Sequence, residues 1–268
     1  MKRAHHESLM EHDLLHAVLS NPTARRVEEL RVNIDGLNIR GPPLRFGSLP
    51  RELLRVLDIA RCSPLTAPPP GAVAFFPRLA YLRLHGCSVS LLDLQRIVDA
   101  APKLATLHLE SLYLLREETM DELPPTEVGI KFFQIRCRAV TALVFADCRY
   151  ETRYYYGGKV GVGVELDAPM LQYFKYKGAV DLLHHLSLKP QASSSMIRVD
   201  VHISVDSNAC ITARGRTIPA EQNILDFFSV LPRHDDTNHL VMHVFNFFHM
   251  IQFKDYFYSS YCNEKLII

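Results

Sequence analysis

The chain has 268 residues, of which 48% are hydrophobic and 22% charged, a composition typical of an ordinary globular protein. Thirty basic residues against 29 acidic ones give a formal net charge of +1. This balance favours neither nucleic acid nor an anionic membrane surface as a partner, because both attract strongly basic chains. The length accommodates one extended domain or two small ones.

Residues 1–20 predict a short N-terminal cap helix, or the remnant of a lost upstream unit, which ends at Asn21-Pro22 because proline disfavours helical geometry in the residue before it. The stretch lacks the continuous apolar core of a signal peptide, so we expect a cytoplasmic or nuclear protein. Six cysteines in such a compartment are expected to be reduced thiols. Because no two of them form a C-x-x-C pair, they do not indicate a structural zinc site.

A pattern of three apolar residues, L-x-x-L-x-L, recurs along the chain from Val27 onward. It starts at Val27, Leu54, Leu79, Leu104, Val140, Leu171 and Met196, with a weaker copy at His239. The seven stronger starts are 27, 25, 25, 36, 31 and 25 residues apart. This period is typical of leucine-rich repeats, in which each repeat adds one strand to a parallel sheet.

Two features that lie outside the apolar positions support the repeat. The ninth position of three copies is a cysteine, at Cys62, Cys87 and Cys148. A proline stands two residues before three copies, at Pro77, Pro102 and Pro169. Between two copies, residues 89–101 have the apolar spacing of an amphipathic helix with Ser90 as its N-cap. We therefore predict an α/β leucine-rich-repeat solenoid, an irregular horseshoe with parallel strands on the concave face and helices or loops on the convex face.

The domain organisation follows from where the pattern begins and ends. Residues 21–232 are predicted to form the repeat domain of about seven units, and residues 233–268 a divergent, aromatic-rich C-terminal cap or tail. The long interval after Leu104 predicts an inserted loop at Glu117–Pro125. Polar and charged residues interrupt the apolar stretch 240–257, so we expect no membrane span.

Two further segments need an explanation. The glycine cluster Gly157–Gly163 has the spacing of neither phosphate-binding loop motif, and it predicts a flexible hairpin or an inserted loop. The neighbouring Arg149–Tyr156 combines cations with aromatic rings, which fits either an inserted edge with solvent-facing tyrosines or a protein contact. Nucleic-acid binding there is disfavoured by the near-zero net charge.

Two phrases carry a resemblance to a known family. They are SVSLLDLQRIVDAAPKL at residues 88–104 and ELDAPMLQYFKYKG at residues 165–178. With them, the chain resembles the leucine-rich-repeat region of plant F-box proteins over roughly residues 21–232. In that family an N-terminal F-box binds a Skp-type adaptor of a cullin ubiquitin ligase, and the repeats select the substrate. No Leu-Pro-x-x-Leu-like segment precedes the repeats here, so we expect that this chain does not dock a Skp-type adaptor by itself.

Side chains alternate along a strand, so the third, fifth and seventh positions of each copy are predicted to face the concave surface. Aromatic and arginine side chains often anchor protein interfaces, which selects two clusters on that surface. The candidate protein-binding residues are Tyr81, Arg83, His85, His108, Tyr173, Lys175, Lys177 and Arg198. The lysines favour an acidic partner surface.

No catalytic, cofactor-binding or metal-ligating constellation is predicted. The shared repeat position of the cysteines indicates small, buried turn residues rather than nucleophiles. His239 and His243 have the spacing of zinc ligands on a helix, but their segment is predicted to be a strand or a cap. The leading hypothesis is a non-enzymatic protein-recognition scaffold. The alternative is a sensor that holds a small, hormone-like molecule on the concave face, which predicts ligand-dependent thermal stabilisation.

Overall fold

The computed structural model describes residues 22–33, 44–71, 74–115, 130–150, 153–155, 158–179, 186–189, 196–204, 211–213, 216–218 and 239–245. It divides into two units, Met1–Asp121 and Glu122–Ile268, and each is described by itself. The predicted cap helix at residues 1–20 and the predicted loop Glu117–Pro125 lie outside the described residues, as do residues 246–268. The boundaries predicted for the repeat domain stay predictions.

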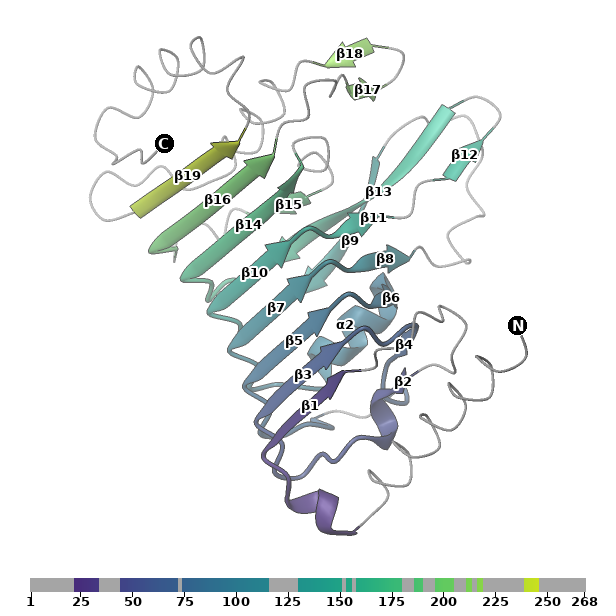
Figure 1. Ribbon diagram of the computed structural model, residues 1–268, viewed down its shortest axis with the longest axis vertical. Coiled ribbons are helices and arrows are strands. Elements are labelled where there is room, and N and C mark those ends of the chain that lie inside the picture. The colour runs from purple at the N-terminus through teal and green to yellow at the C-terminus, as the bar shows by residue number, and fades with distance from the viewer. Residues whose placement is uncertain are drawn as a thin grey trace. The chain divides into compact units, whose positions relative to one another are not determined.

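Four repeats of the first unit each contribute one strand to a parallel sheet (Figure 1). The strands, in their order across the sheet, are β1 (Glu29–Asn33), β3 (Val56–Ala60), β5 (Tyr81–His85) and β7 (Thr106–Glu110). Leu57 lies beside Leu82, and Leu82 lies beside Leu107. The fourth position of each copy therefore aligns with the fourth position of the next, which confirms the predicted repeat register in this unit.

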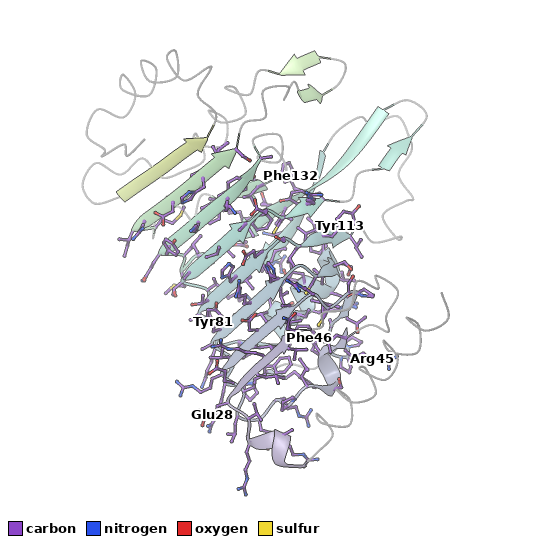
Figure 2. The ribbon with its side chains drawn as sticks, viewed as in Figure 1. Glu28, Arg45, Phe46, Tyr81, Tyr113 and Phe132 are labelled. Atoms are coloured by element: carbon purple, nitrogen blue, oxygen red, sulfur yellow. The ribbon has the colours of Figure 1, made fainter. Side chains whose placement is uncertain are left out.

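A second parallel sheet runs through the same repeats. Its strands are β2 (Leu44–Arg45), β4 (Leu65–Thr66), β6 (Ser88–Ser90) and β8 (Tyr113–Leu115), adjacent in that order. The core-facing apolar side chains of the main sheet are buried, and Leu57, Leu82 and Leu107 are 0% exposed. Phe46, labelled in Figure 2, meets Phe76 edge to face with ring centroids 6.1 Å apart. This core accounts for the apolar positions of the repeat.

The helices of the first unit are short. Two 3-10 helices, η1 (Pro22–Arg26) and η2 (Phe46–Ser48), accompany the α-helix α2 (Leu91–Asp99). The Ser90 side chain caps α2 by accepting a hydrogen bond from the Asp93 amide at 3.0 Å, which confirms the predicted N-cap. The helices in the described part of the chain are too short or too polar to span a membrane.

After β3, β5 and β7 the chain turns through one residue in the left-handed conformation. Arg61, Gly86 and Ser111 follow β3, β5 and β7 with φ of 58°, 60° and 52°. These turns place the ninth repeat position inside the core, where the Cys62 thiol donates to the Ala60 carbonyl at 3.5 Å. Cys87 is buried in the same way, so the interpretation of these cysteines as turn residues is confirmed.

The second unit repeats this plan with longer strands. Its main parallel sheet has β10 (Ala142–Ala146), β14 (Tyr173–Ala179), β16 (Arg198–Ser204) and β19 (His239–Phe245) in that order. A second parallel group contains β9 (Ile130–Arg136), β13 (Gly158–Asp167) and β15 (Leu186–Leu188), with β13 in the middle. The remaining strands are β11 (Arg149–Tyr150), β12 (Arg153–Tyr155), β17 (Ile211–Ala213) and β18 (Arg216–Ile218).

The structure confirms one prediction for this unit, excludes one alternative at Tyr150 and corrects the position of one repeat. The glycine-rich start of β13 pairs antiparallel with β12, as the predicted hairpin requires. Tyr150 does not face solvent: it is 7% exposed and its ring stacks on Phe145, because β11 turns this side chain inward. The weak eighth copy was placed two residues too late, since Val199 pairs with Leu240 rather than with Met242. A two-residue slip keeps the same side chains on the same face, so alternation alone does not detect it.

Replacing Leu82 with alanine (Leu82→Ala) is expected to lower the free energy of unfolding by about 2–5 kcal/mol, because it opens a cavity at a fully buried position. Urea unfolding followed by circular dichroism measures the change. The matched control is Leu92→Ala on α2, where the side chain is only half-buried and the loss should be clearly smaller. Equal losses in the two variants would contradict the repeat register.

Candidate functional site

On β1, β3, β5, β7, β10, β14 and β16, the side of the strand that points away from the core is partly open to solvent, and we call it the open face. Its middle strands β3, β5 and β7 alternate half-buried and buried residues, as the repeat predicts. Strand pairing sorts the open-face residues into rows. One row holds Val56, Tyr81 and Thr106, the next Asp58, Arg83 and His108, and the third Ala60, His85 and Glu110. The open face of the first unit thus has a fixed pattern of side chains. Tyr81, the first residue of β5, is labelled in Figure 2.

Glu110 lies at the centre of the predicted cluster in the first unit. Its Oε2 accepts a hydrogen bond from Arg83 Nη2 at 2.7 Å. The same oxygen is 3.5 Å from His85 Nδ1 and 3.4 Å from His108 Nε2. On the other side, Arg83 Nη1 is 3.6 Å from Asp58 Oδ2. The structure therefore brings three predicted contact residues together around one carboxylate.

The electrostatics of this cluster favour the ionised pair. The hydrogen bond from Arg83 holds the pKa of Glu110 below its ordinary value, although burial acts in the opposite direction. The same hydrogen bond raises the pKa of Arg83. Because Arg83 lies between two carboxylates, its charge is neutralised within the open face rather than presented alone to a partner.

The open face of the second unit is organised around Asp200. Among the described residues it is the one charged side chain that is buried, with 5% exposure. Arg198 binds it in two places, Nε to Oδ1 at 2.9 Å and Nη2 to Oδ2 at 3.0 Å. The hydroxyl of Tyr173 donates to Oδ2 at 2.8 Å. Two predicted contact residues, from neighbouring strands β14 and β16, are thus held by one carboxylate.

These contacts change the proton affinities of the three groups. Burial, followed by the hydrogen bond to Asp200, raises the pKa of Tyr173 to about 12. Burial also acts to raise the pKa of Asp200, but the hydrogen bonds from Arg198 and Tyr173 outweigh it, and the pKa lies below its ordinary value. Asp200 is therefore ionised and Tyr173 protonated at neutral pH, which keeps the hydrogen bonds between them formed.

The two predicted lysines lie on β14, between β10 and β16. In the strand register, Lys175 of β14 lies beside Asp200 of β16 on one side and beside Val144 of β10 on the other. Lys177 Nζ makes an ion pair with Asp147 Oδ2 at 2.8 Å. The predicted preference for an acidic partner therefore has less positive charge behind it than the sequence indicated, because Lys177 and Arg198 already have carboxylate partners.

Four carboxylates that the predicted set did not include complete the two clusters. They are Asp58, Glu110, Asp147 and Asp200. Strand register offered a signal for two of them, since Asp58 and Arg83 occupy the same repeat position of neighbouring copies, as do Lys175 and Asp200. Opposite charges at equal repeat positions are placed side by side in a parallel sheet.

The thiols and histidines of the described residues offer little reactive chemistry. Burial raises the pKa of Cys62 to about 12 and that of Cys87 to about 11, which disfavours the nucleophilic thiolate. No group of three His, Cys, Asp or Glu side chains in the described ranges is arranged to hold a metal ion. The arrangement is suited to contact through hydrogen bonds, ion pairs and aromatic rings.

Parallel strands at a fixed repeat, buried leucines and turn cysteines together define an α/β leucine-rich-repeat protein. The family model described as "FBD-associated F-box protein At5g56370, LRR repeats" matches residues 15–151, slightly more than half of the chain. The chain belongs to this plant F-box-associated leucine-rich-repeat family. No curated protein and no solved structure matches it.

Replacing Glu110 with glutamine (Glu110→Gln) is expected to lower stability at neutral pH and to flatten its dependence on pH in acid. The folded-state pKa of Glu110 is lowered from 4.5, so its carboxylate stabilises the fold above that pH and the contribution is lost as the pH falls through the lowered value. Urea midpoints between about pH 7 and about pH 3 measure both effects.

The control for this variant is Glu52→Gln, which removes an equal charge from an exposed position. It should follow the pH profile of the unchanged protein. If the profile of Glu110→Gln also coincides with that of the unchanged protein, Glu110 does not organise the cluster.

Proposed function

We propose that this chain is a non-enzymatic protein-recognition scaffold, and that its open faces select a partner protein as the substrate-binding repeats of F-box ubiquitin-ligase subunits do. Leucine-rich-repeat families of F-box-associated proteins are typically interaction modules, which supports the coarse assignment. The observation that carries the proposal is the pair of carboxylate-centred clusters, at Glu110 and at Asp200, on strands whose opposite face is core.

The clusters suit recognition because they are ordered before a partner arrives. Arg83, Tyr173 and Arg198 are each held by hydrogen bonds to carboxylates from neighbouring strands or from their own strand. Side chains that are already fixed lose less conformational entropy on binding. Tyrosine and arginine in such settings are the residue types that most often dominate interface energies.

The finer parts of this proposal come from the family resemblance and from the sequence. They are the link to a ubiquitin ligase, the cytoplasmic or nuclear location, and the inability to dock a Skp-type adaptor without another chain. The alternative of a small-molecule sensor also stays a prediction. Pull-down with a purified Skp-type adaptor tests the adaptor statement, since robust capture by this chain would contradict it.

The double variant Arg83→Ala/Tyr173→Ala is expected to reduce recovery of the partner by about tenfold or more in quantitative affinity purification, because it removes one anchor from each cluster. The matched control is Arg45→Ala/Tyr113→Ala, which removes the same residue types from exposed positions on β2 and β8 (Figure 2). Circular dichroism establishes that both variants fold. Equal recovery by both double variants would contradict the open face as the binding surface.

A further inference from the structure

The β9–β13–β15 sheet of the second unit is a different sheet from the one whose strands carry the open face. Ile135, Leu166 and Leu188 point into the core and are at most 2% exposed. Because side chains alternate along each strand, the polar residues between them share the opposite face of this sheet. Strand pairing places Gln134 beside Glu165, and Arg136 beside Asp167. The result is a compact polar face of three neighbouring strands.

A pocket of about 510 Å³ opens at the carboxyl ends of β9 and β13. It is lined by Gln134, Arg136, Arg138, Asp167, Pro169 and Lys189. Arg138 and Pro169 come from the turns that follow the two strands, where the Cys137 amide donates to the Asp167 carbonyl at 2.8 Å. The pocket walls therefore belong to paired strands and to turns bonded to them.

The polar floor of the pocket is held by its own hydrogen bonds. Asp167 Oδ2 accepts from Gln134 Nε2 at 3.0 Å and from Lys189 Nζ at 3.5 Å. Lys189 Nζ is also 3.9 Å from Glu165 Oε2, just outside the lining residues. The ammonium of Lys189 is thus shared by two carboxylates. The other two cations that line the pocket are the exposed Arg138 and Arg136, whose Nη2 donates to Gln134 Oε1 at 3.5 Å.

The charge balance selects the ligand. Three cations face two carboxylates when Glu165 is counted, so the pocket and its edge carry one net positive charge. A carboxylate ligand, with one negative charge, balances that surplus, whereas the two charges of a phosphate dianion exceed it. The planar guanidinium groups also match a carboxylate in geometry, since they donate two parallel hydrogen bonds.

An exposed aromatic ring extends the surface. Phe132 is 46% exposed and lies on β9 on the same side as Gln134 and Arg136, because the three positions differ by two residues (Figure 2). Phe132 and Arg136 are separated by about 13 Å along the strand at the usual rise per residue. An extended peptide that puts a carboxylate into the pocket would place an apolar side chain on Phe132 four residues away.

We propose that the Arg136–Arg138 pocket and Phe132 form a binding site for an extended acidic peptide of a partner protein, with one Asp or Glu side chain in the pocket and an apolar residue four positions from it. This site does not rest on the proposed role of the open face. Through this site the second unit recognises a short linear segment of a partner rather than the partner's folded surface.

The experiment measures fluorescence anisotropy of a labelled peptide of the form Leu-x-x-x-Glu, with serine and glycine spacers, against the full chain. Saturable binding is expected, weaker by about tenfold when the glutamate is replaced by glutamine and weaker when the leucine is replaced by serine. Absence of saturable binding would overturn the proposal. Tighter binding of a phosphoserine peptide than of the glutamate peptide would overturn the assignment of the carboxylate.

The variant Arg136→Gln/Arg138→Gln is expected to weaken peptide binding by about tenfold and to reduce its dependence on salt. The control Arg25→Gln/Arg26→Gln lowers the net charge equally at exposed positions of η1, and it should bind as the unchanged chain does. If the double variant fails to fold by circular dichroism, Arg138→Gln alone in its exposed turn serves the same comparison. If the variant and the control weaken peptide binding equally, the effect comes from the overall charge of the chain, and the proposed site is overturned.

The same peptide separates this site from the open face. Arg83→Ala/Tyr173→Ala should bind the peptide as the unchanged chain does while it loses the partner in affinity purification. Loss of peptide binding in that variant would place the peptide on the open face and overturn the proposal, without touching the proposed function of the scaffold.

Discussion

The alignment of buried leucines between consecutive strands is the constraint on which the rest of the structure depends. Leu57, Leu82 and Leu107 occupy the same position of three repeats and lie side by side, all withdrawn from solvent. A slip by one residue would turn every one of them outward, so the hydrophobic effect fixes the register strongly. Parallel strands also need a return segment between them, and the short strands β4, β6 and β8 and the helix α2 lie in those returns.

The same register determines what the open face presents. Once the leucines are aligned, Asp58 must lie beside Arg83, and Lys175 beside Asp200, because each pair shares a repeat position. The placement of opposite charges side by side on the face is thus a consequence of core packing rather than an independent feature. Substitutions at open-face positions leave the leucine rows intact, which is how a repeat scaffold varies its surface without losing its fold.

The sequence predicted the scaffold well wherever the period was regular. Leu54, Leu79 and Leu104 are evenly spaced, and the strands that follow each of them have the predicted alternation. The copy near His239 was placed two residues off, because alternation repeats every two residues and no regular interval was left to choose between registers. The alternative of solvent-facing tyrosines in Arg149–Tyr156 does not hold at Tyr150, because stacking on Phe145 buries its ring. Residue type within one copy does not single out the carboxylates among the residues of this face, because their pairing depends on the neighbouring copy.

Charge is distributed differently on the two candidate surfaces of the second unit. On the open face Asp200 takes up the charge of Arg198, and Asp147 that of Lys177, so little net field is left to steer a partner. At the ends of β9 and β13, three cations lie near two carboxylates, so one net positive charge remains. A surface with balanced, prearranged charges discriminates through hydrogen-bond geometry, because a mismatched partner leaves buried polar groups unpaired. A surface with a small surplus discriminates by the sign of the ligand's charge. A chain that carries both selects a folded surface with one and an acidic segment with the other, and the two requirements together are stricter than either alone.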